Sequence, residues 1–166
     1  MNAEAVNRAN ANRWFALALW VGLCVTVGIV SGWLFKPGAW YATLEKPFFN
    51  PPAVVFAPVW TVLYIAMGVA AWRIWTLPPS PERKQALRQF GVQLALNAAW
   101  TPVFFGAQSL GGGLVVIVAM VFAIVVTIQR FHPLDKIAAW LLAPYLAWVA
   151  FATALNVALL ALNGKF

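Results

Sequence analysis

The residues best placed to bind a ligand are three tryptophans inside long apolar stretches, Trp60, Trp100 and Trp148. Other tryptophans lie near the ends of such stretches, where an indole ring is at home in the membrane–water interface. At about 100° per residue, Trp148, Ala152 and Leu155 share one side of a helix, and the small Ala152 leaves room beside a flat ring. Indoles next to small residues predict a planar apolar pocket; aromatic side chains that simply fill a core are the alternative.

One apolar stretch carries two amides, Gln93 and Asn97, on the same helical face as Trp100 and Phe104. An amide side chain in the hydrocarbon region is costly unless it finds a partner inside a helix bundle. This face is therefore predicted to point into the protein.

The opposite face of that stretch has a small residue at every fourth position, namely Gly91, Ala95 and Ala99. A small-xxx-small pattern allows two helix backbones to approach each other closely. We expect this stripe to pack against a neighbouring helix, either of the same chain or of a second subunit in a homodimer.

The sequence gives little support for a catalytic or ion-binding site built from ionisable side chains. Asp, Glu and His are absent from the middle of the apolar stretches, which removes the usual proton relays and carboxylate ion sites. The single histidine, His132, precedes Pro133 in a short loop, so no axial haem ligand is expected inside the bundle. The single cysteine, Cys24, excludes an internal disulfide. We predict no metal site, and no nucleophile–base pair or phosphate-binding loop is recognisable.

The composition is that of an integral membrane protein. Of 166 residues, 63% are hydrophobic and 9% are charged, whereas soluble domains carry about 25% charged residues. The net charge of +7 is spread over the ends of apolar segments, which argues against a nucleic-acid-binding surface. Residues 1–13 are polar and the following apolar run exceeds the roughly 7–15 residues of a signal-peptide core, so no targeting segment is expected.

Five apolar runs are long enough to cross a hydrocarbon core about 30 Å thick, which takes roughly 20 residues per helix. They cover residues 14–35, 54–76, 87–106, 112–130 and 137–161. We therefore predict an all-α membrane protein, a bundle of five transmembrane helices that forms one domain over residues 1–166. Pro58, Pro102 and Pro144 fall within these runs and are expected to kink the helices.

The basic residues are divided unequally between the two sides that these spans define. Eight lie on the side of the N-terminus, and three, Lys36, Lys46 and Lys165, lie on the other. The positive-inside rule then predicts a cytoplasmic N-terminus and a cytoplasmic loop at 77–86. An odd number of spans places the C-terminus on the opposite side.

A stiff aromatic segment, "WYATLEKPFFNPP", separates the first two apolar runs. Lys46 precedes Pro47 and is restricted to extended geometry. Asn50, before two prolines, is predicted to be the N-cap of the next helix. Because the segment is too long for a minimal hairpin and too apolar to extend into water, residues 36–53 are predicted to fold back as a structured cap over the mouth of the bundle.

The residues from this segment onward carry a family resemblance. The run "WYATLEKPFFNPPAVVFAPVWTVLYIAMGVA" resembles the signature of the TspO/MBR family, the tryptophan-rich sensory proteins or translocator proteins, also called the peripheral benzodiazepine receptor. "GVQLALNAAWTPVFFG" is similar to the family's third helix, and "PYLAWVAFATALN" to its fifth. The similarity extends in register over about residues 28–157.

This resemblance implies a membrane bundle of five helices that commonly forms a homodimer through the third. It also implies a pocket, capped by the first loop, for tetrapyrroles, cholesterol and synthetic isoquinoline carboxamides. Transferred by motif position, the pocket residues would be Val30, Trp60, Asn97, Trp100, Trp148, Ala152 and Leu155. Some bacterial members degrade protoporphyrin in light and oxygen, and the two tryptophans implicated match Trp60 and Trp148.

The sequence departs from the family in two places. Gly112 stands where vertebrate members place a tryptophan, and "VALLALNGKF" lacks the tyrosine and basic residue of the cholesterol-recognition motif. Such motifs are weak predictors, and cholesterol is not predicted as a specific ligand. A porphyrin or haem would bind by ring stacking, with its propionates reaching Lys36 or Lys46, and no obligatory cofactor is expected.

We therefore expect a multi-pass receptor or sensor in a bacterial membrane, inner or outer, that binds porphyrins or similar flat hydrophobic ligands and modulates tetrapyrrole traffic or stress regulation. Its expected partners are such a ligand, the lipid bilayer and a second copy of the chain, with no nucleic acid. A light- and oxygen-dependent porphyrin-degrading enzyme and a porphyrin or lipid transporter remain as alternatives.

Overall fold

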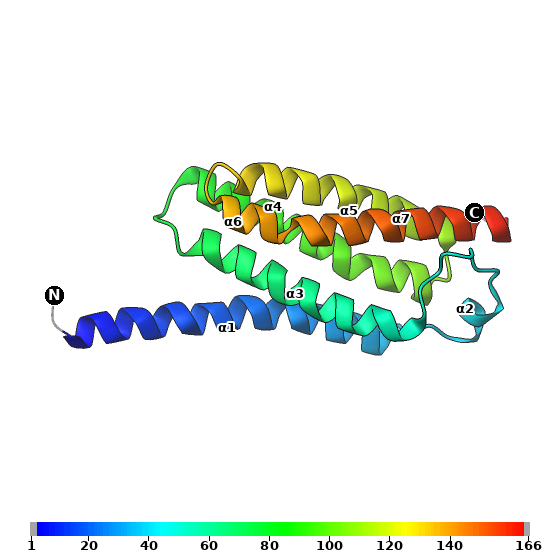
Figure 1. Ribbon diagram of the computed structural model, residues 1–166, viewed down its shortest axis with the longest axis horizontal. Helices are drawn as coiled ribbons and strands as arrows, with labels where there is room; N and C mark the ends of the chain where they lie inside the picture. The colour runs from blue at the N-terminus through cyan, green and yellow to red at the C-terminus, as the bar shows by residue number, and fades with distance from the viewer. Residues whose placement is uncertain (1–2, 165–166) are drawn as a thin grey trace.

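The computed structural model describes residues 3–164, and over that range the chain is helical with no β-strand. Figure 1 shows a bundle of long helices with one short helix, α2, at the end that holds the C-terminus. The elements are α1 (Ala3–Leu34), α2 (Ala39–Thr43), α3 (Ala53–Trp75), α4 (Pro81–Thr101), the π-helix η1 (Pro102–Gly106), α5 (Leu110–Phe131), α6 (Lys136–Leu141) and α7 (Ala143–Asn163).

Within the described residues, four helical segments are long and apolar enough to cross a membrane: Asn12–Leu34, Ala53–Trp75, Leu110–Phe131 and Lys136–Asn163. All four differ by one or two residues at each end from the runs predicted at 14–35, 54–76, 112–130 and 137–161. The run predicted at 87–106 divides between α4 and η1. α4 begins with charged residues and continues with amides, so by composition it does not qualify as a span.

The change from α4 to η1 follows from Pro102. Proline has no backbone N–H and its ring clashes with the preceding turn, so the regular hydrogen-bond ladder cannot continue through it. The helix instead continues as a π-helix, in which hydrogen bonds join residues five positions apart rather than four. The N–H of Ala107 accordingly donates to the carbonyl of Pro102 at 2.8 Å. Pro58 lies inside α3, whereas Pro144 lies in the first turn of α7, just after the break at Leu142.

Side-chain caps start three of the helices. The hydroxyl of Ser80 accepts from the N–H of Arg83 at the start of α4, and Ser109 does the same for Gly112 in α5. Asp135 caps α6 by accepting from Ile137 and Ala138. The prediction that Asn50 caps α3 is wrong, because Pro52 occupies that position and the Asn50 amide donates to the carbonyl of Pro51 instead.

Two glycines allow α1 and α3 to pack closely against each other. A Cβ on Gly68 would lie 2.5 Å from the Cα of Val21, and a Cβ on Gly28 would lie 2.1 Å from the ring of Tyr64. On the other side of α3, α4 packs on α5, and α5 packs on α7 (Figure 1). The space left between these two groups of helices holds the cavity described below.

Residues 36–52, here called the lid, connect α1 to α3 at the end of the bundle where α7 finishes (Figure 1). Trp40 and Tyr41 of α2 place their rings edge-on to Phe104 of η1, at centroid distances of 5.9 and 6.3 Å. Leu44 packs in the same cluster with Leu159 of α7. The π-helix therefore gives the lid an aromatic surface on which to rest.

Candidate ligand-binding cavity

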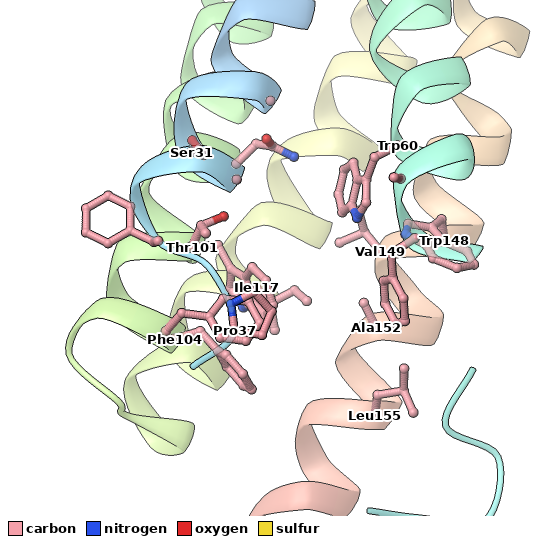
Figure 2. A pocket seen from close by; sticks show the side chains of 18 of the residues that line it. Ser31, Pro37, Trp60, Thr101, Phe104, Ile117, Trp148, Val149, Ala152 and Leu155 are labelled. Carbon is pink, nitrogen blue, oxygen red and sulfur yellow. The ribbon is translucent and has the colours of Figure 1, made fainter. Parts of the chain in front are cut away.

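A cavity of about 720 Å³ lies under the lid and is lined by residues of α1, α3, α4, η1, α5 and α7. Figure 2 shows Trp60, Trp148, Ala152 and Leu155 on one side and Thr101 and Phe104 on the other. Ligand pockets of about 300–1,000 Å³ enclose most of the surface of a drug-sized molecule. The volume is therefore sufficient for a large flat ligand.

The two sides of the cavity are aromatic. On one side the ring of Trp60 stacks on Tyr64, with centroids 5.4 Å apart and planes inclined by 29°. On the other side Trp100 stacks on Phe104, with centroids 4.8 Å apart and planes inclined by 23°. Aromatic rings prefer such offset arrangements, and each stacked pair fixes the orientation of its indole.

Six of the seven pocket residues expected from the family resemblance line this cavity. They are Trp60, Asn97, Trp100, Trp148, Ala152 and Leu155. They come from three helices, α3, α4 and α7, and from sequence positions almost a hundred residues apart. The helical faces inferred from periodicity therefore point to a common space.

A buried hydrogen-bond chain crosses the cavity wall. The hydroxyl of Tyr64 donates to Oδ1 of Asn97 at 2.7 Å, and Nδ2 of Asn97 donates to the hydroxyl of Tyr145 at 3.1 Å. Tyr145 donates in turn to the sulfur of Met120 at 3.4 Å. The Asn97 amide is thus engaged at both ends, which explains how an amide is tolerated in this apolar setting.

The TspO/MBR family model matches residues 20–162, most of the chain. The chain belongs to the TspO/MBR family.

Relatives in the TspO/MBR family come from bacteria and animals. The chain is 45% identical to the tryptophan-rich protein TspO of Chlorobaculum tepidum, over 89% of this chain and 95% of that one. It is 43% identical to the tryptophan-rich sensory protein of Cereibacter sphaeroides, over 80% and 82% of the two chains. It is 40% identical to the translocator protein of Homo sapiens, over 81% and 82%. With its apolar helices, this TspO/MBR chain is an integral membrane protein.

Val30 does not line the TspO/MBR cavity, so its assignment to the pocket is wrong. α1 contributes Val25, Gly28, Ile29, Ser31 and Gly32 instead. One residue is about 100° of rotation on a helix. Val30 is separated by that angle from Ile29 and from Ser31, which both line the cavity, and its own side chain does not.

The two lysines considered for ligand carboxylates differ in position. Lys46 lines the TspO/MBR cavity, whereas Lys36 does not. The Nζ of Lys46 donates to the carbonyl of Leu44 at 3.2 Å and lies 5.0 Å from the ring centroid of Tyr41. Burial raises the pKa of the Tyr41 phenol, so this ring stays neutral beside the ammonium.

The cavity has unused hydrogen-bonding capacity at three points. Among the described residues, Nε1 of Trp100, Oδ1 of Asn50 and Oδ1 of Asn156 have no hydrogen-bond partner, although all three atoms are buried. All three residues line the cavity. No Asp, Glu or His lines it, and the described part of the chain has no cluster of His, Cys, Asp and Glu that could hold a metal. The TspO/MBR cavity can therefore stack and hydrogen-bond a ligand, but it offers no carboxylate or imidazole for acid–base catalysis.

Sequence reasoning missed Tyr145, which does not line the cavity but is fully buried behind it, where it contacts two lining residues, Trp60 and Asn97. Its position three residues before Trp148, on the same helical face, was the available signal. Ser31, Thr101 and Ile117 line the cavity and were not anticipated.

The small stripe of α4 lies away from the cavity. Gly91 and Ala95 are exposed and Ala99 is half-buried. A Cβ on Gly91 would have no atom within 4 Å. Within this TspO/MBR chain, then, Gly91 packs against no other helix.

Proposed function

We propose that this TspO/MBR protein is a membrane receptor or sensor that binds a porphyrin or a similar flat hydrophobic ligand in the cavity under the lid. The observation that supports this most is the pair of facing aromatic walls, Trp60 with Trp148 on one side and Trp100 with Phe104 on the other. A planar ring between such walls buries both faces, and the gain is roughly proportional to the apolar area removed from water.

The polar groups favour a ligand with a carboxylate at its edge. Lys46 supplies a positive charge from the lid, and the indole N–H of Trp100 is a free donor in the wall. Nothing in the cavity lining would supply an axial nitrogen from histidine to a haem iron. The ring rather than the metal is therefore the part of the ligand that this cavity recognises.

A titration with protoporphyrin IX, in detergent or nanodiscs, tests the proposal. The ligand should quench tryptophan fluorescence, and the Trp148→Ala variant should bind roughly tenfold more weakly, because one stacking surface is lost. Trp140→Ala is the matched control, since that indole is 71% exposed and does not line the cavity. Equal affinity in the wild type and both variants would refute the assignment of the cavity.

A second candidate function is the degradation of porphyrin in light and oxygen. It is favoured by the position of Trp60 and Trp148 in one cavity, where both indoles would lie beside an excited porphyrin. Illuminated wild-type protein should then form a distinct product faster than the Trp60→Phe variant. Equal bleaching of porphyrin by the two proteins would refute degradation and leave ligand binding as the function. Uptake of porphyrin into proteoliposomes that contain the protein would instead identify a carrier.

We also propose five spans, with α4 and η1 together forming the third of them. The supporting argument is that α4 packs lengthwise on α5, so the two should lie at the same depth (Figure 1). The basic loops between α3 and α4 and between α5 and α6 would then face the cytoplasm, by the positive-inside rule. Lys165, counted on the opposite side, lies outside the described residues. Single cysteines introduced at 79 and at 38, in a Cys24→Ala background, can be labelled with a thiol reagent that does not cross the membrane. The two positions should react from opposite sides of the membrane.

Homodimer formation through α4 is the remaining part of the proposal. The exposed stripe of Gly91, Ala95 and Ala99 is a surface on which a second copy of the helix would pack closely. Gly91→Leu should shift the purified protein from dimer to monomer in light scattering. Val115→Leu, on the exposed face of α5, is the control and should leave the dimer intact.

A further inference from the structure

The last turn of α7 holds the lid through one side chain. Oδ1 of Asn163 accepts a hydrogen bond from the backbone N–H of Glu45 at 3.0 Å, and Nδ2 of Asn163 donates to the carbonyl of Glu45 at 3.0 Å. The same Nδ2 also donates to the carbonyl of Leu159 at 2.8 Å, one turn back along α7. A single amide thus pairs with both backbone polar groups of one residue, 118 positions away in the sequence.

Apart from the first turn of α3, where the N–H of Val55 donates to the carbonyl of Pro52, no other hydrogen bond joins the lid to the helices of the bundle in the described part of the chain. The remaining lid contacts are aromatic and aliphatic, such as those of Trp40 and Tyr41 with Phe104. Apolar contacts of this kind are non-directional, so they allow a surface to shift or rotate. A two-point hydrogen bond fixes both the position and the rotation of the peptide it holds.

The peptide held by Asn163 is next to the residues that close the cavity. Lys46 follows Glu45 directly, and Asn50 and Pro51 follow in the same segment; all three line the cavity. The Nζ of Lys46 in turn donates to the carbonyl of Leu44, the residue that precedes Glu45. The position of Lys46 over the cavity therefore depends on how the Glu45 peptide is held.

We propose that Asn163 is a positioning residue that latches the lid over the cavity and thereby sets the rate at which ligand enters and leaves. This inference rests on the proposed function, because it gives the lid a ligand to retain. Asn163 itself does not line the cavity, so it acts through Glu45 and Lys46 rather than by touching the ligand.

Two variants separate hydrogen bonding from packing. Asn163→Leu keeps a side chain of similar size and loses both bonds to Glu45. Asn163→Asp keeps the shape and the acceptor, but it loses the donor and sets a carboxylate against the Glu45 carbonyl. Leu162→Ala is the matched control, since Leu162 lies in the same turn of α7 and its side chain is 47% exposed.

The experiment follows protoporphyrin IX by stopped flow, with the full-length protein in nanodiscs. Both Asn163 variants should bind and release the ligand roughly five- to tenfold faster, as expected when one or two net hydrogen bonds of the closed state are lost. The equilibrium affinity should change less than either rate, because the stacking walls are untouched. Leu162→Ala should keep the wild-type rates. Unchanged rates in both Asn163 variants would overturn the proposal.

A second measurement tests the latch without any ligand. Amide hydrogen exchange in the peptide that contains Glu45 should be faster in both Asn163 variants than in the wild type, while exchange in α5 should stay the same. If wild-type protein fails to bind protoporphyrin, the proposed function fails, whereas the exchange result still decides the latch. Equal exchange at Glu45 in all proteins would refute the latch even if the ligand binds.

Discussion

The hydroxyl of Tyr64 donates a 2.7 Å hydrogen bond to Oδ1 of Asn97, joining α3 to α4 in the wall of the cavity. Since Asn97 also donates to Tyr145, replacing it by leucine would leave two buried phenols without that partner. We expect Asn97→Leu to lower the free energy of unfolding by about 1–2 kcal/mol. Tyr64→Phe should cost less in the Asn97→Leu background than alone, as measured by melting in detergent. Strict additivity of the two changes would contradict this coupling.

Gly28 makes room for the ring of Tyr64. A Cβ at this position would lie 2.1 Å from Cε2 of Tyr64, far inside van der Waals contact. Because the Tyr64 ring is held at its hydroxyl by Asn97, it cannot swing away freely. Gly28→Ala should therefore destabilise the protein by about 1–3 kcal/mol, as overpacking does, and should weaken protoporphyrin binding.

Gly22→Ala is the control for that change, because a Cβ on Gly22 would meet no atom within 4 Å. The same substitution there should be neutral, or stabilising by about 0.5–1 kcal/mol from the better helix propensity of alanine. Thermal melts of the two variants should move in different directions, and a similar loss at both glycines would show that Tyr64 is not the cause.

Gln108 holds a left-handed backbone conformation, with φ of 53°, between η1 and α5. This conformation costs a residue with a Cβ about 1 kcal/mol of conformational free energy, a cost that glycine does not have. Gln108→Gly should therefore raise the melting temperature slightly. Ala107→Gly, at an ordinary right-handed position with φ of −83°, should lower it. A loss of stability in Gln108→Gly would mean that the glutamine side chain contributes more than the backbone costs.

Asp135 links α3 to α6. Its Oδ2 forms an ion pair with Nε of Arg73 at 2.8 Å, and the same side chain caps α6. Burial raises the pKa of Asp135, but the hydrogen bond from Arg73, those from the N–H groups of Ala138 and Ile137, and the Arg73 charge outweigh it and hold the pKa below its usual range. The ionised form is therefore preferred in the folded protein. Its stabilising contribution is complete above the ordinary value of about 3.9 and disappears as the pH falls through the lower folded pKa.

Asp135→Asn tests this, because asparagine caps a helix about as well as aspartate but cannot form the ion pair. At pH 7 the variant should be less stable by up to about 1 kcal/mol, the range for partly exposed pairs. The difference between the two melting temperatures should begin to shrink below about pH 4, where Asp135 takes up a proton in the unfolded chain, and should vanish below the lower folded pKa, where Asp135 is neutral in both states. A difference that stays constant down to pH 3 would contradict the role of ionised Asp135.

The family and the helical faces could be predicted from local sequence. Trp60, Asn97 and Trp148 line the cavity because periodicity within one helix decides which side chains share a face. Rotation of the first helix was harder to predict. Val30 and Ile29 are both apolar, so hydropathy does not distinguish the residue that lines the cavity from the one that does not.

The start of α3 and the division of the third apolar run between α4 and η1 show where prediction from local residue propensities fails. Asn50 has the chemistry of an N-cap, yet Pro52 takes that place. Pro102 was expected to kink its helix, but it opens a π-helix that turns Phe104 toward Trp40 and Tyr41. Propensities rank what a residue can do locally, while packing against the rest of the chain selects the outcome.

The sequence by itself determined that the chain lies in a membrane, which segments are apolar helices, and which residues share a side of each. Those properties depend on neighbours within a few turns of one helix. Only the tertiary structure decided that Tyr145 accepts a hydrogen bond from Asn97, that Gly28 receives the ring of Tyr64, and that Asn163 holds Glu45. These contacts join residues 36 to 118 positions apart. They depend on the rotation and depth of whole helices, which are set by side-chain packing and are not recorded in the local sequence pattern.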